Sequence, residues 1–235
     1  KQSIAESSFD AWTKFYQQDE NAPNSIVSYY GKGALLAFVL DVEIRKATQD
    51  KVTLDDVLRY AYAHYSDSGL QDSDIAQIVD QLTGQPFNAF FEQYLYGVDE
   101  LPLKEAFNYV GVDCQFGINA KDMVAFGVRV TNDNGSSKIT QVLDDSCAQQ
   151  SGLFVGDVVI AIDGVKVAHE NLVSVINKST SGATLEFAIS RDQLMKNVSV
   201  KVSFNKESHC TLSLMNKPDS TTKVRQKQWF YGVTG

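Results

Sequence analysis

Apolar residues in the first hundred positions recur with the spacing of an α-helix. Phe9, Trp12 and Tyr16 lie three and four residues apart, so residues 7–16 are predicted to form a helix with an apolar stripe along one face. In residues 27–47, apolar side chains occupy so many positions that only a helix covered on nearly all sides can bury them. We therefore expect this second helix to form the core of its domain.

Start and stop signals place further helices in the same region. Thr53 is followed three residues later by Asp56, a capping-box-like pair that favours a helix start. Pro86 is typical of the first turn of a helix, and Gly97 is typical of a helix end. The expected helices are residues 7–16, 27–47, 54–65, 73–82 and 87–95. Because no convincing strand pattern lies between them, these residues predict an all-α domain.

After residue 103 the pattern changes to the alternation that is typical of β-strands. The expected strands are residues 124–130, 139–143, 158–162, 184–189 and 198–204. Turn signals such as Asp163-Gly164 separate them. Two short helical patches are expected near residues 147–151 and 169–177. The pattern predicts a small β-barrel-like module with two helices.

The sequence therefore predicts a multidomain α and β protein. We expect an α-helical subdomain at residues 1–108 and the β module at residues 112–206. Residues 207–235 contain Trp229 and its aromatic neighbours, and we expect them to form a tail that packs back on one of the domains.

Composition and charge narrow the function. The chain has 235 residues, of which 43% are hydrophobic, so it can build real cores. Its net charge of −8 has the wrong sign for binding phosphates, so nucleic acid is a poor candidate partner. The apolar stretch at residues 34–40 is far shorter than the ~20 residues of a membrane span, so no membrane is expected. The chain begins at Lys1, and we expect it to be a piece of a longer protein.

Few residues in this chain suggest chemistry of their own. The three cysteines have no C-x-x-C spacing, so we expect three thiols outside any disulfide, buried or half-buried. His169-Glu170 is followed by Asn171, Leu172 and Val173, so the second histidine of an H-E-x-x-H zinc motif is missing. No G-x-S-x-G elbow occurs either. We expect no metal site in this chain, and from the residues alone the first domain is an α-helical domain of unknown use.

Several runs in the first domain resemble a known family. They are residues 7–16, 19–25, 28–36, 55–58, 83–94 and 97–103, of which 28–36 reads Ser-Tyr-Tyr-Gly-Lys-Gly-Ala-Leu-Leu. Together they closely resemble the region downstream of the zinc-binding helix in the glycyl aminopeptidase family of gluzincin metallopeptidases. The resemblance implies a helical subdomain of the thermolysin-like C-terminal type. It also implies a zinc ion in the full-length enzyme, with its ligands upstream of this chain, so that the chain is inactive by itself.

The resemblance also implies a catalytic residue. Similar gluzincin aminopeptidases place a catalytic tyrosine immediately before an x-Lys-Gly step, and Tyr30 precedes Gly31-Lys32-Gly33 here. A fixed neutral phenol can stabilise the oxyanion that forms when a peptide carbonyl is attacked. The alternative interpretation is that Tyr29 and Tyr30 are aromatic residues that pack at a helix start. The two glycines fit a close approach of the backbone to a neighbour or to a substrate, and helix packing explains them equally well.

The second module resembles a PDZ domain. Ala125, Phe126, Gly127 and Val128 stand where such domains carry their carboxylate-binding loop. The Gly-Asp turn at residues 156–157, the apolar strand after it and the Asp-Gly at 163–164 follow the PDZ order, and residues 169–177 align with the groove helix. The resemblance implies a groove that adds the C-terminal segment of a peptide to a sheet edge. Ala125 replaces the leading glycine of the commonest loop, which is a departure that affects carboxylate capture.

The groove helix supplies further candidate residues. His169 stands where it can hydrogen-bond a serine or threonine hydroxyl two residues before the peptide terminus, although an exposed histidine at a helix start would look the same in sequence. Val128, Val173 and Ile176 are expected to form the apolar wall. We expect an open groove, and the alternative is that the C-terminal tail or the helical domain occupies it.

The sequence thus predicts the C-terminal part of a bacterial zinc aminopeptidase that releases small N-terminal residues, glycine or alanine, from peptides. Its partners would be peptides and the upstream catalytic domain of the same protein. Its compartment would be the cytoplasm or the periplasm. The alternative is a non-catalytic peptide-binding protein in which a helical scaffold displays the PDZ groove.

Overall fold

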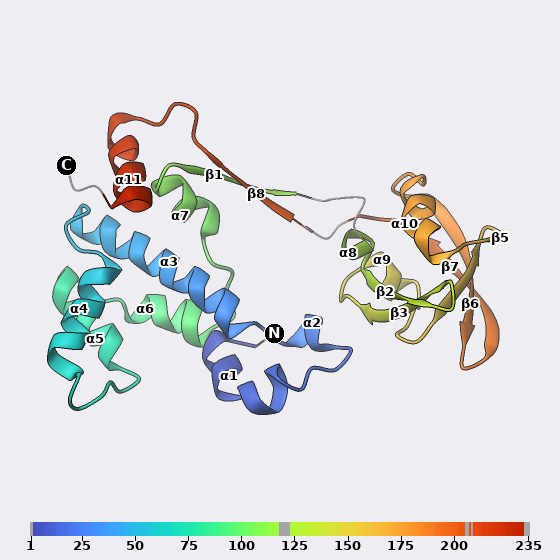
Figure 1. Cartoon of the computed structure of the whole chain (residues 1–235), viewed down its shortest axis with the longest axis horizontal. Coiled ribbons are helices and arrows are strands. Elements are labelled where there is room, and N and C mark those ends of the chain that lie inside the picture. The colour runs from blue at the N-terminus through green and yellow to red at the C-terminus, as the bar shows by residue number, and fades with distance from the viewer. Residues whose placement is uncertain (1, 118–122, 205–206, 208, 233–235) are drawn as a thin grey trace. The chain divides into compact units, whose positions relative to one another are not determined.

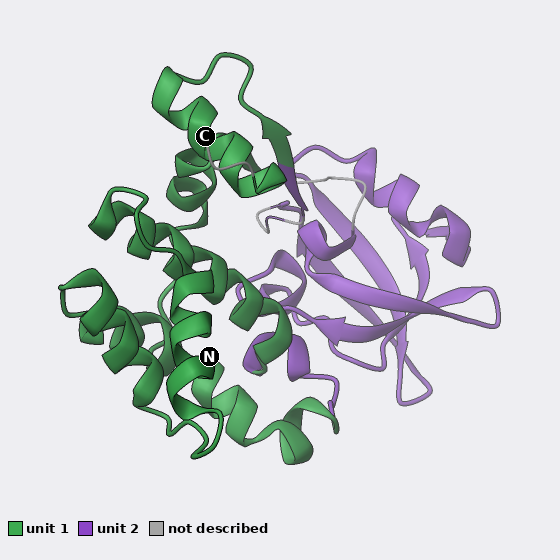
Figure 2. Ribbon diagram, turned by 60° about the vertical axis from the view of Figure 1, so that its left-hand side comes forward, with its two compact units in different colours: residues 1–17, 26–115, 212–235 green, residues 18–25, 116–211 purple. Residues whose placement is uncertain are grey.

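The computed structural model describes residues 2–117, 123–204, 207 and 209–232. Its contacts divide the chain into two compact units, coloured separately in Figure 2. Unit 1 contains residues 1–17, 26–115 and 212–235, and unit 2 contains residues 18–25 and 116–211. The domain boundaries expected from the sequence, 1–108, 112–206 and 207–235, remain predictions.

Unit 1 consists mainly of helices, which Figure 1 labels in chain order. They are α1 (Ile4–Phe9), the π-helical turn η1 (Ala11–Phe15), α3 (Tyr29–Thr48), α4 (Leu54–Tyr65), α5 (Asp74–Thr83), α6 (Asn88–Phe91), the π-helical turn η2 (Glu92–Tyr96), α7 (Leu103–Tyr109) and α11 (Ser220–Tyr231). Strands β1 (Val112–Gly117) and β8 (His209–Leu214) pair with each other, and the boundary between the units falls within both strands.

Helix α3 lies at the centre of unit 1, as expected, but its burial is uneven. From Leu36 onward it supplies two apolar clusters, one against α4 and α5 through Leu40 and Ile44, and one against α7 through Val39 and Val42. Before Leu36 its residues are exposed or half-buried, so the expected burial on nearly all sides is wrong for the first two turns.

The stretch Ala22–Thr48 is long and apolar enough to cross a membrane by length and composition. This is weak evidence for a membrane span, because the core helix of a globular domain meets the same test. Val39, Val42 and Ile44 of α3 are fully buried within unit 1, as a core helix requires.

The capping box predicted for α4 is confirmed. The Thr53 hydroxyl accepts a hydrogen bond from the backbone N–H of Asp56, and the Asp56 carboxylate accepts one from the backbone N–H of Thr53. Each partner satisfies a donor that the first turn of a helix leaves open. The next helix, α5, ends at Gly84, which adopts the left-handed conformation with φ 69°.

Helix α11, which the sequence patterns did not predict as a helix, is anchored on unit 1 by polar contacts. Arg225 pairs with Asp50 at 2.8 Å, and its guanidinium lies 4.0 Å from the ring centre of Tyr109. The indole N–H of Trp229 donates to the carboxylate of the buried Asp41 over 3.3 Å. The contacts of α11 that the structure describes are therefore made within unit 1.

Unit 2 is an antiparallel sheet with short helices, which confirms the predicted fold class. Its strands are β2 (Val128–Asp133), β3 (Ser136–Val142), β4 (Val158–Ile162), β5 (Val165–Lys166), β6 (Thr184–Arg191) and β7 (Leu194–Lys201). Their order in the sheet is β2-β3-β4-β6-β7, with β5 paired to β4. Across the described residues this sheet is open rather than closed into a barrel. Its helices are α2 (Ala22–Ser25), α8 (Met123–Phe126), α9 (Cys147–Gln150) and α10 (His169–Asn177).

Two expectations for unit 2 need correction. The strand predicted at residues 124–130 begins only at Val128, because α8 occupies the residues before Gly127. The expectation that all three thiols are buried or half-buried is wrong for Cys210, which is exposed, whereas Cys114 and Cys147 are buried.

A buried ion pair holds the turn before β4. Asp157 is fully buried, and both of its carboxylate oxygens accept hydrogen bonds from Arg191 at 2.6 and 2.7 Å. Arg191 also donates to the carbonyl of Gly152 and covers the ring of Phe154. A carboxylate without solvent needs such a partner, so this pair fixes the turn that leads into the sheet.

Candidate functional site

Tyr30 lies in the first turn of α3 and its side chain is 60% exposed. Ser28 caps this helix, because its hydroxyl accepts a hydrogen bond from the backbone N–H of Gly31 at 3.1 Å. The cap fixes the direction in which α3 begins. Tyr30 therefore presents a phenol to solvent from a rigid helix end.

Three phenol groups meet at this point of unit 1. The Tyr16 oxygen lies 2.9 Å from the Tyr30 oxygen and 3.1 Å from the Tyr29 oxygen, both within hydrogen-bond distance. The rings of Tyr29 and Tyr30 have centres 4.2 Å apart. We call these three residues the tyrosine cluster.

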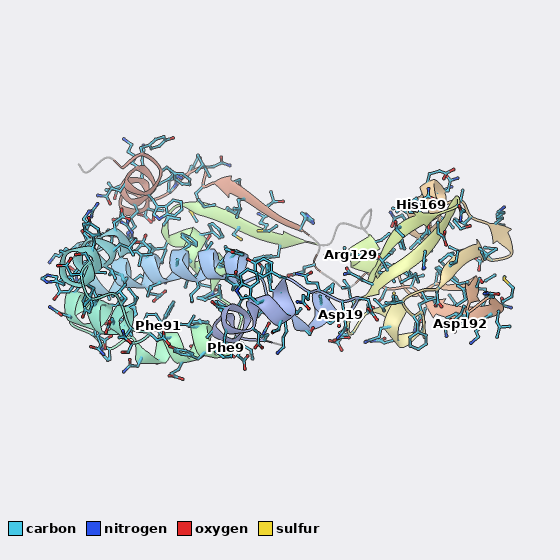
Figure 3. All side chains as sticks on the ribbon, turned by 60° about the horizontal axis from the view of Figure 1, so that its bottom comes forward. Phe9, Asp19, Phe91, Arg129, His169 and Asp192 are labelled. Atoms are coloured by element: carbon cyan, nitrogen blue, oxygen red, sulfur yellow. The ribbon has the colours of Figure 1, made fainter. Side chains whose placement is uncertain are left out.

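The aromatic stripe predicted for residues 7–16 borders the tyrosine cluster. Phe15 makes edge contacts with the rings of Tyr29 and Tyr30, and the Trp12 ring lies 5.2 Å from Tyr16. Phe9, labelled in Figure 3, is 88% exposed and Trp12 is 80% exposed. The stripe is thus a largely exposed aromatic surface of unit 1 and not one face of a buried helix.

Hydrogen bonding within the cluster moves two phenol pKa values apart. The hydrogen bond with Tyr16, and secondarily the interaction with Tyr29, stabilises the ionised form of Tyr30 and holds its pKa below the usual value. The hydrogen bond to Tyr16 raises the pKa of Tyr29 instead. Of these two residues, Tyr30 is therefore the better proton donor.

The glycines on either side of Lys32 are not required by packing among the described residues. A methyl group on Gly33 would have no neighbour within 4 Å, and one on Gly31 would meet the hydroxyl of Ser28 at an ordinary contact distance of 3.5 Å. Lys32 reaches the carbonyl of Asp99 at 3.4 Å. Helix packing within unit 1 therefore does not explain why glycine stands at these positions.

The predicted carboxylate-binding loop lies between α8 and β2 of unit 2. Gly127 has φ +102°, and a Cβ there would lie 2.0 Å from the Cβ of Ser146, so only glycine fits. Ala125, Phe126 and Val128 are buried, and the Phe126 ring stacks on Phe187. The loop is therefore built into the core of its unit.

Several backbone groups of this loop already have partners. The N–H of Gly127 donates to the carbonyl of Met123 at 2.9 Å, and its carbonyl accepts from Leu143 at 2.8 Å. The thiol of Cys147 donates to the carbonyl of Phe126 at 3.3 Å. Gly127 is thus occupied as a donor, so a peptide carboxylate would have to use neighbouring amides.

Strand β2 stands at the end of the strand order, so one side of it has no strand partner in the described sheet. Helix α10 packs against β2 and β3. Arg129 and His169, labelled in Figure 3, come from β2 and α10 respectively. Arg129 is exposed, and its guanidinium has no ion-pair or hydrogen-bond partner among the described residues. An edge strand beside a helix can accept an extended peptide.

His169 is held at the start of α10. Its Nδ1 lies 2.8 Å from the hydroxyl of Ser137 on β3, and its backbone N–H donates to the carbonyl of Gly135. The ring is half-buried, so the simple alternative of an exposed histidine is wrong. The bond at Nδ1 leaves Nε2 as the ring atom that can meet a ligand.

The three residues predicted for the apolar wall lie at different depths. Val128 and Ile176 belong to the core cluster and are almost fully buried, whereas Val173 is half-buried. Val173 is therefore the residue of the three that is best placed to meet a ligand side chain. The role of all three in peptide binding remains a prediction.

The described residues hold no group of three or more histidine, cysteine, aspartate or glutamate side chains that could bind a metal ion. Two of the three histidines are already engaged. His64 stacks on Tyr60 with ring centres 4.2 Å apart, and His169 bonds to Ser137. The donor set of this part of the chain does not fit a zinc site.

Sequence reasoning did not connect Tyr16 with Tyr30. The two residues are fourteen positions apart, beyond any spacing that one helix would bring together. Both residues lie in stretches that are rich in aromatic side chains. The sequence pattern around Tyr16 predicted only an apolar stripe on one face of a helix. Arg129 was missed because an alternating strand predicts its exposure but not its lack of a partner.

Comparisons with known proteins point to two families. Residues 1–36 match the M61 glycyl aminopeptidase family, and residues 124–202 match the PDZ domain family. No curated protein matches the chain.

Among solved structures, an aminopeptidase N family protein from Idiomarina loihiensis is similar, with 31% identity, a TM-score of 0.84 and coverage of 94% of this chain. The chain spans 40% of that protein's length. The HtrA-type protease AlgW with a decapeptide shares 18% identity over 34% of this chain and 29% of its own, with a TM-score of 0.33. The PDZ domain of EpsC from Vibrio cholerae shares 16% identity over 34% of this chain and 99% of its own, with a TM-score of 0.28. The last two scores are too low to carry an argument.

Proposed function

Because the chain belongs to the M61 glycyl aminopeptidase family and carries a PDZ domain, as its sequence predicted, we propose that it is the C-terminal part of a zinc-dependent aminopeptidase. The enzyme releases small N-terminal residues, glycine or alanine, from peptides. The observation that supports this best is the exposed Tyr30 phenol, which stands at a helix start inside the segment that matches the family.

Tyr30 acts on the carbonyl group that is attacked. When a nucleophile adds to a peptide carbonyl, negative charge develops on the carbonyl oxygen. A phenol held in place before the reaction donates a hydrogen bond that is stronger in the transition state than in the bound substrate. The lowered pKa of Tyr30 strengthens this donation.

The M61 family is zinc-dependent, and the described residues of this chain do not fit a zinc site. We propose that the zinc ligands belong to a part of the protein outside this sequence. The chain spans 40% of the matched Idiomarina protein, which leaves ample length for them. When bound, zinc would supply the Lewis acid and the activated water of the family's chemistry.

The PDZ domain binds the C-terminal segments of peptides. The support for this role is the edge position of β2 beside α10, which gives a peptide a strand to pair with. Arg129, at the start of that strand, adds a positive charge that suits a terminal carboxylate.

A peptide-release assay with the full-length protein tests the aminopeptidase role. We expect release of glycine or alanine from short peptide amides with a free N-terminus, and no release from the same peptides after N-acetylation. The chain alone, given one equivalent of zinc, should release nothing. If the full-length protein releases nothing while the chain binds peptides, the aminopeptidase role is contradicted, and the non-catalytic peptide-binding protein with a helical scaffold replaces it.

Fluorescence polarisation with labelled C-terminal peptides tests the PDZ role in the chain itself. We expect micromolar binding that is lost when the peptide carboxylate is amidated. Val173→Glu should weaken binding, whereas the matched change Val165→Glu, at a position that is 68% exposed on β5, should not. Equal binding of the amidated peptide would contradict carboxylate capture.

A further inference from the structure

Tyr16 is the shared partner within the tyrosine cluster. Its oxygen lies between the other two phenols, at 2.9 Å from Tyr30 and 3.1 Å from Tyr29. Tyr29 and Tyr30 lie at the start of α3, whereas Tyr16 is the residue that ends η1. The position of the Tyr30 oxygen is therefore set by two different elements of unit 1.

The Tyr16 side chain is itself held in place. Its backbone N–H donates to the carbonyl of Ala11 at 2.9 Å, and its ring contacts those of Trp12 and Phe15 with centres 5.2 and 5.4 Å apart. A side chain that is held by its backbone hydrogen bond and by contacts with two neighbouring rings loses little further freedom when it forms a hydrogen bond.

A phenol has one proton to donate and lone pairs to accept with. If Tyr29 donates to Tyr16 and Tyr16 donates to Tyr30, the oxygen of Tyr30 is an acceptor in the cluster and its own O–H points away from it. That O–H is then available to an oxygen outside the cluster. The raised pKa of Tyr29 and the lowered pKa of Tyr30 agree with this direction, since hydrogen bonds received by Tyr30 favour its phenolate.

We propose that Tyr16 is a positioning residue that donates its hydroxyl proton to Tyr30 and thereby directs the Tyr30 O–H toward the substrate carbonyl oxygen. The proposal rests on the role of Tyr30 in the proposed function. A chain of donors also polarises each following O–H, so Tyr16 strengthens the hydrogen bond that Tyr30 gives.

The test uses Tyr16→Phe, which removes the hydroxyl and keeps the ring. In this chain, labelled with ¹³C at the tyrosine ζ carbon, NMR titration of the wild type should show Tyr30 ionising before Tyr29. In Tyr16→Phe, the pKa of Tyr30 should rise and that of Tyr29 should fall. Tyr62→Phe, at a tyrosine that is 79% exposed on α4, is the matched control and should change neither.

In the full-length protein, Tyr16→Phe should lower kcat about tenfold with little change in KM, the pattern of a lost transition-state interaction. An unchanged Tyr30 pKa in the variant, or Tyr29 ionising before Tyr30 in the wild type, would overturn the proposal. If Tyr30→Phe is fully active, the role of Tyr30 fails together with this inference, and if the full-length wild type releases no glycine or alanine, the proposed function fails. If Tyr30→Phe is inactive while Tyr16→Phe turns over normally, only this inference fails.

Discussion

The tyrosine cluster of unit 1 and the loop of unit 2 hold their functional groups in opposite ways. In unit 2, Ala125, Phe126 and Val128 are buried, and both backbone polar groups of Gly127 have partners inside the unit. In unit 1, Tyr30 is mostly exposed, and its phenol is hydrogen-bonded to Tyr16, which is itself exposed.

The difference shows what each site needs to be complete. The loop and the edge strand that we propose to bind peptides belong to one compact unit, so this role can be tested in this chain. The aromatic side chains around the tyrosine cluster are largely exposed, which suits a site that another surface completes. The following predictions test this comparison, beginning with the largest expected effect on stability.

Gly127→Ala should break unit 2. The new methyl group would overlap Ser146 at 2.0 Å and would be forced into a backbone conformation with φ +102°. We expect a loss of about 4 kcal/mol or more in the free energy of unfolding of this unit, seen as the collapse of its amide NMR signals.

The matched change in unit 1 is Gly33→Ala. This glycine lies in α3 with nothing within 4 Å of the added methyl group. Alanine is a better helix former by up to ~1 kcal/mol, so α3 should be unchanged or slightly stabilised. If Gly127→Ala and Gly33→Ala lowered the free energy of unfolding of their units equally, the contrast between the two sites would be contradicted.

Asp157→Asn should destabilise unit 2 by about 3 kcal/mol, because it breaks a buried ion pair and leaves Arg191 without its carboxylate. Asp55→Asn in unit 1 removes an exposed partner of Arg59 and should cost less than about 1 kcal/mol. Chemical denaturation followed by residue-resolved hydrogen exchange measures both. If Asp157→Asn and Asp55→Asn lowered the free energy of unfolding by similar amounts, the buried pair of Asp157 and Arg191 would not stabilise unit 2 as proposed.

High pH should weaken unit 1. Burial, followed by the hydrogen bond to Asp50, raises the pKa of Tyr109 to about 12. Because the folded pKa is raised, this contribution is fully present below the unfolded pKa near 10 and is lost as the pH rises through about 12.

Denaturation between pH 9 and 12 checks this prediction. Over this pH range, the free energy of unfolding of the wild type should fall by about 1 kcal/mol more than that of Tyr109→Phe, which is the net value of one side-chain hydrogen bond. If the free energy of unfolding changed with pH in the same way in the wild type and in Tyr109→Phe, the contribution of the Tyr109 hydroxyl would be contradicted.

His169→Ala should have the smallest effect of this series. We expect peptide binding to persist and the preference for serine or threonine two residues before the terminus to fall roughly fivefold, because one hydrogen bond through Nε2 is lost. A peptide series that differs only at that residue measures the preference. An unchanged preference would leave His169 with the structural role of holding Ser137.

Local patterns predicted much of the fold. The capping pair Thr53 and Asp56 marked the start of α4, and β4 and α10 have the predicted bounds. Helix α11 was missed because its polar residues show no helical apolar stripe, and its anchors are distant residues such as Asp50. The start of β2 was misplaced because alternation alone does not reveal the turn at Gly127.

The candidate sites were predictable only in their separate parts. Tyr30 and the loop residues followed from family resemblance, which is read along the chain. The hydrogen bonds between Tyr16 and Tyr30 and between Ser137 and His169 join residues that are 14 and 32 positions apart. Such contacts depend on tertiary packing, which periodicity does not encode.

The central claim is that Tyr30 stabilises the transition state in the full-length protein. The direct measurement is kcat and KM for glycine release by Tyr30→Phe, with Tyr62→Phe as the exposed control in the same unit. We predict that Tyr30→Phe lowers kcat ~10²-fold or more with KM and stability nearly unchanged, and that Tyr62→Phe matches the wild type. Normal turnover by Tyr30→Phe would contradict the account and return Tyr30 to the role of an aromatic residue at a helix start.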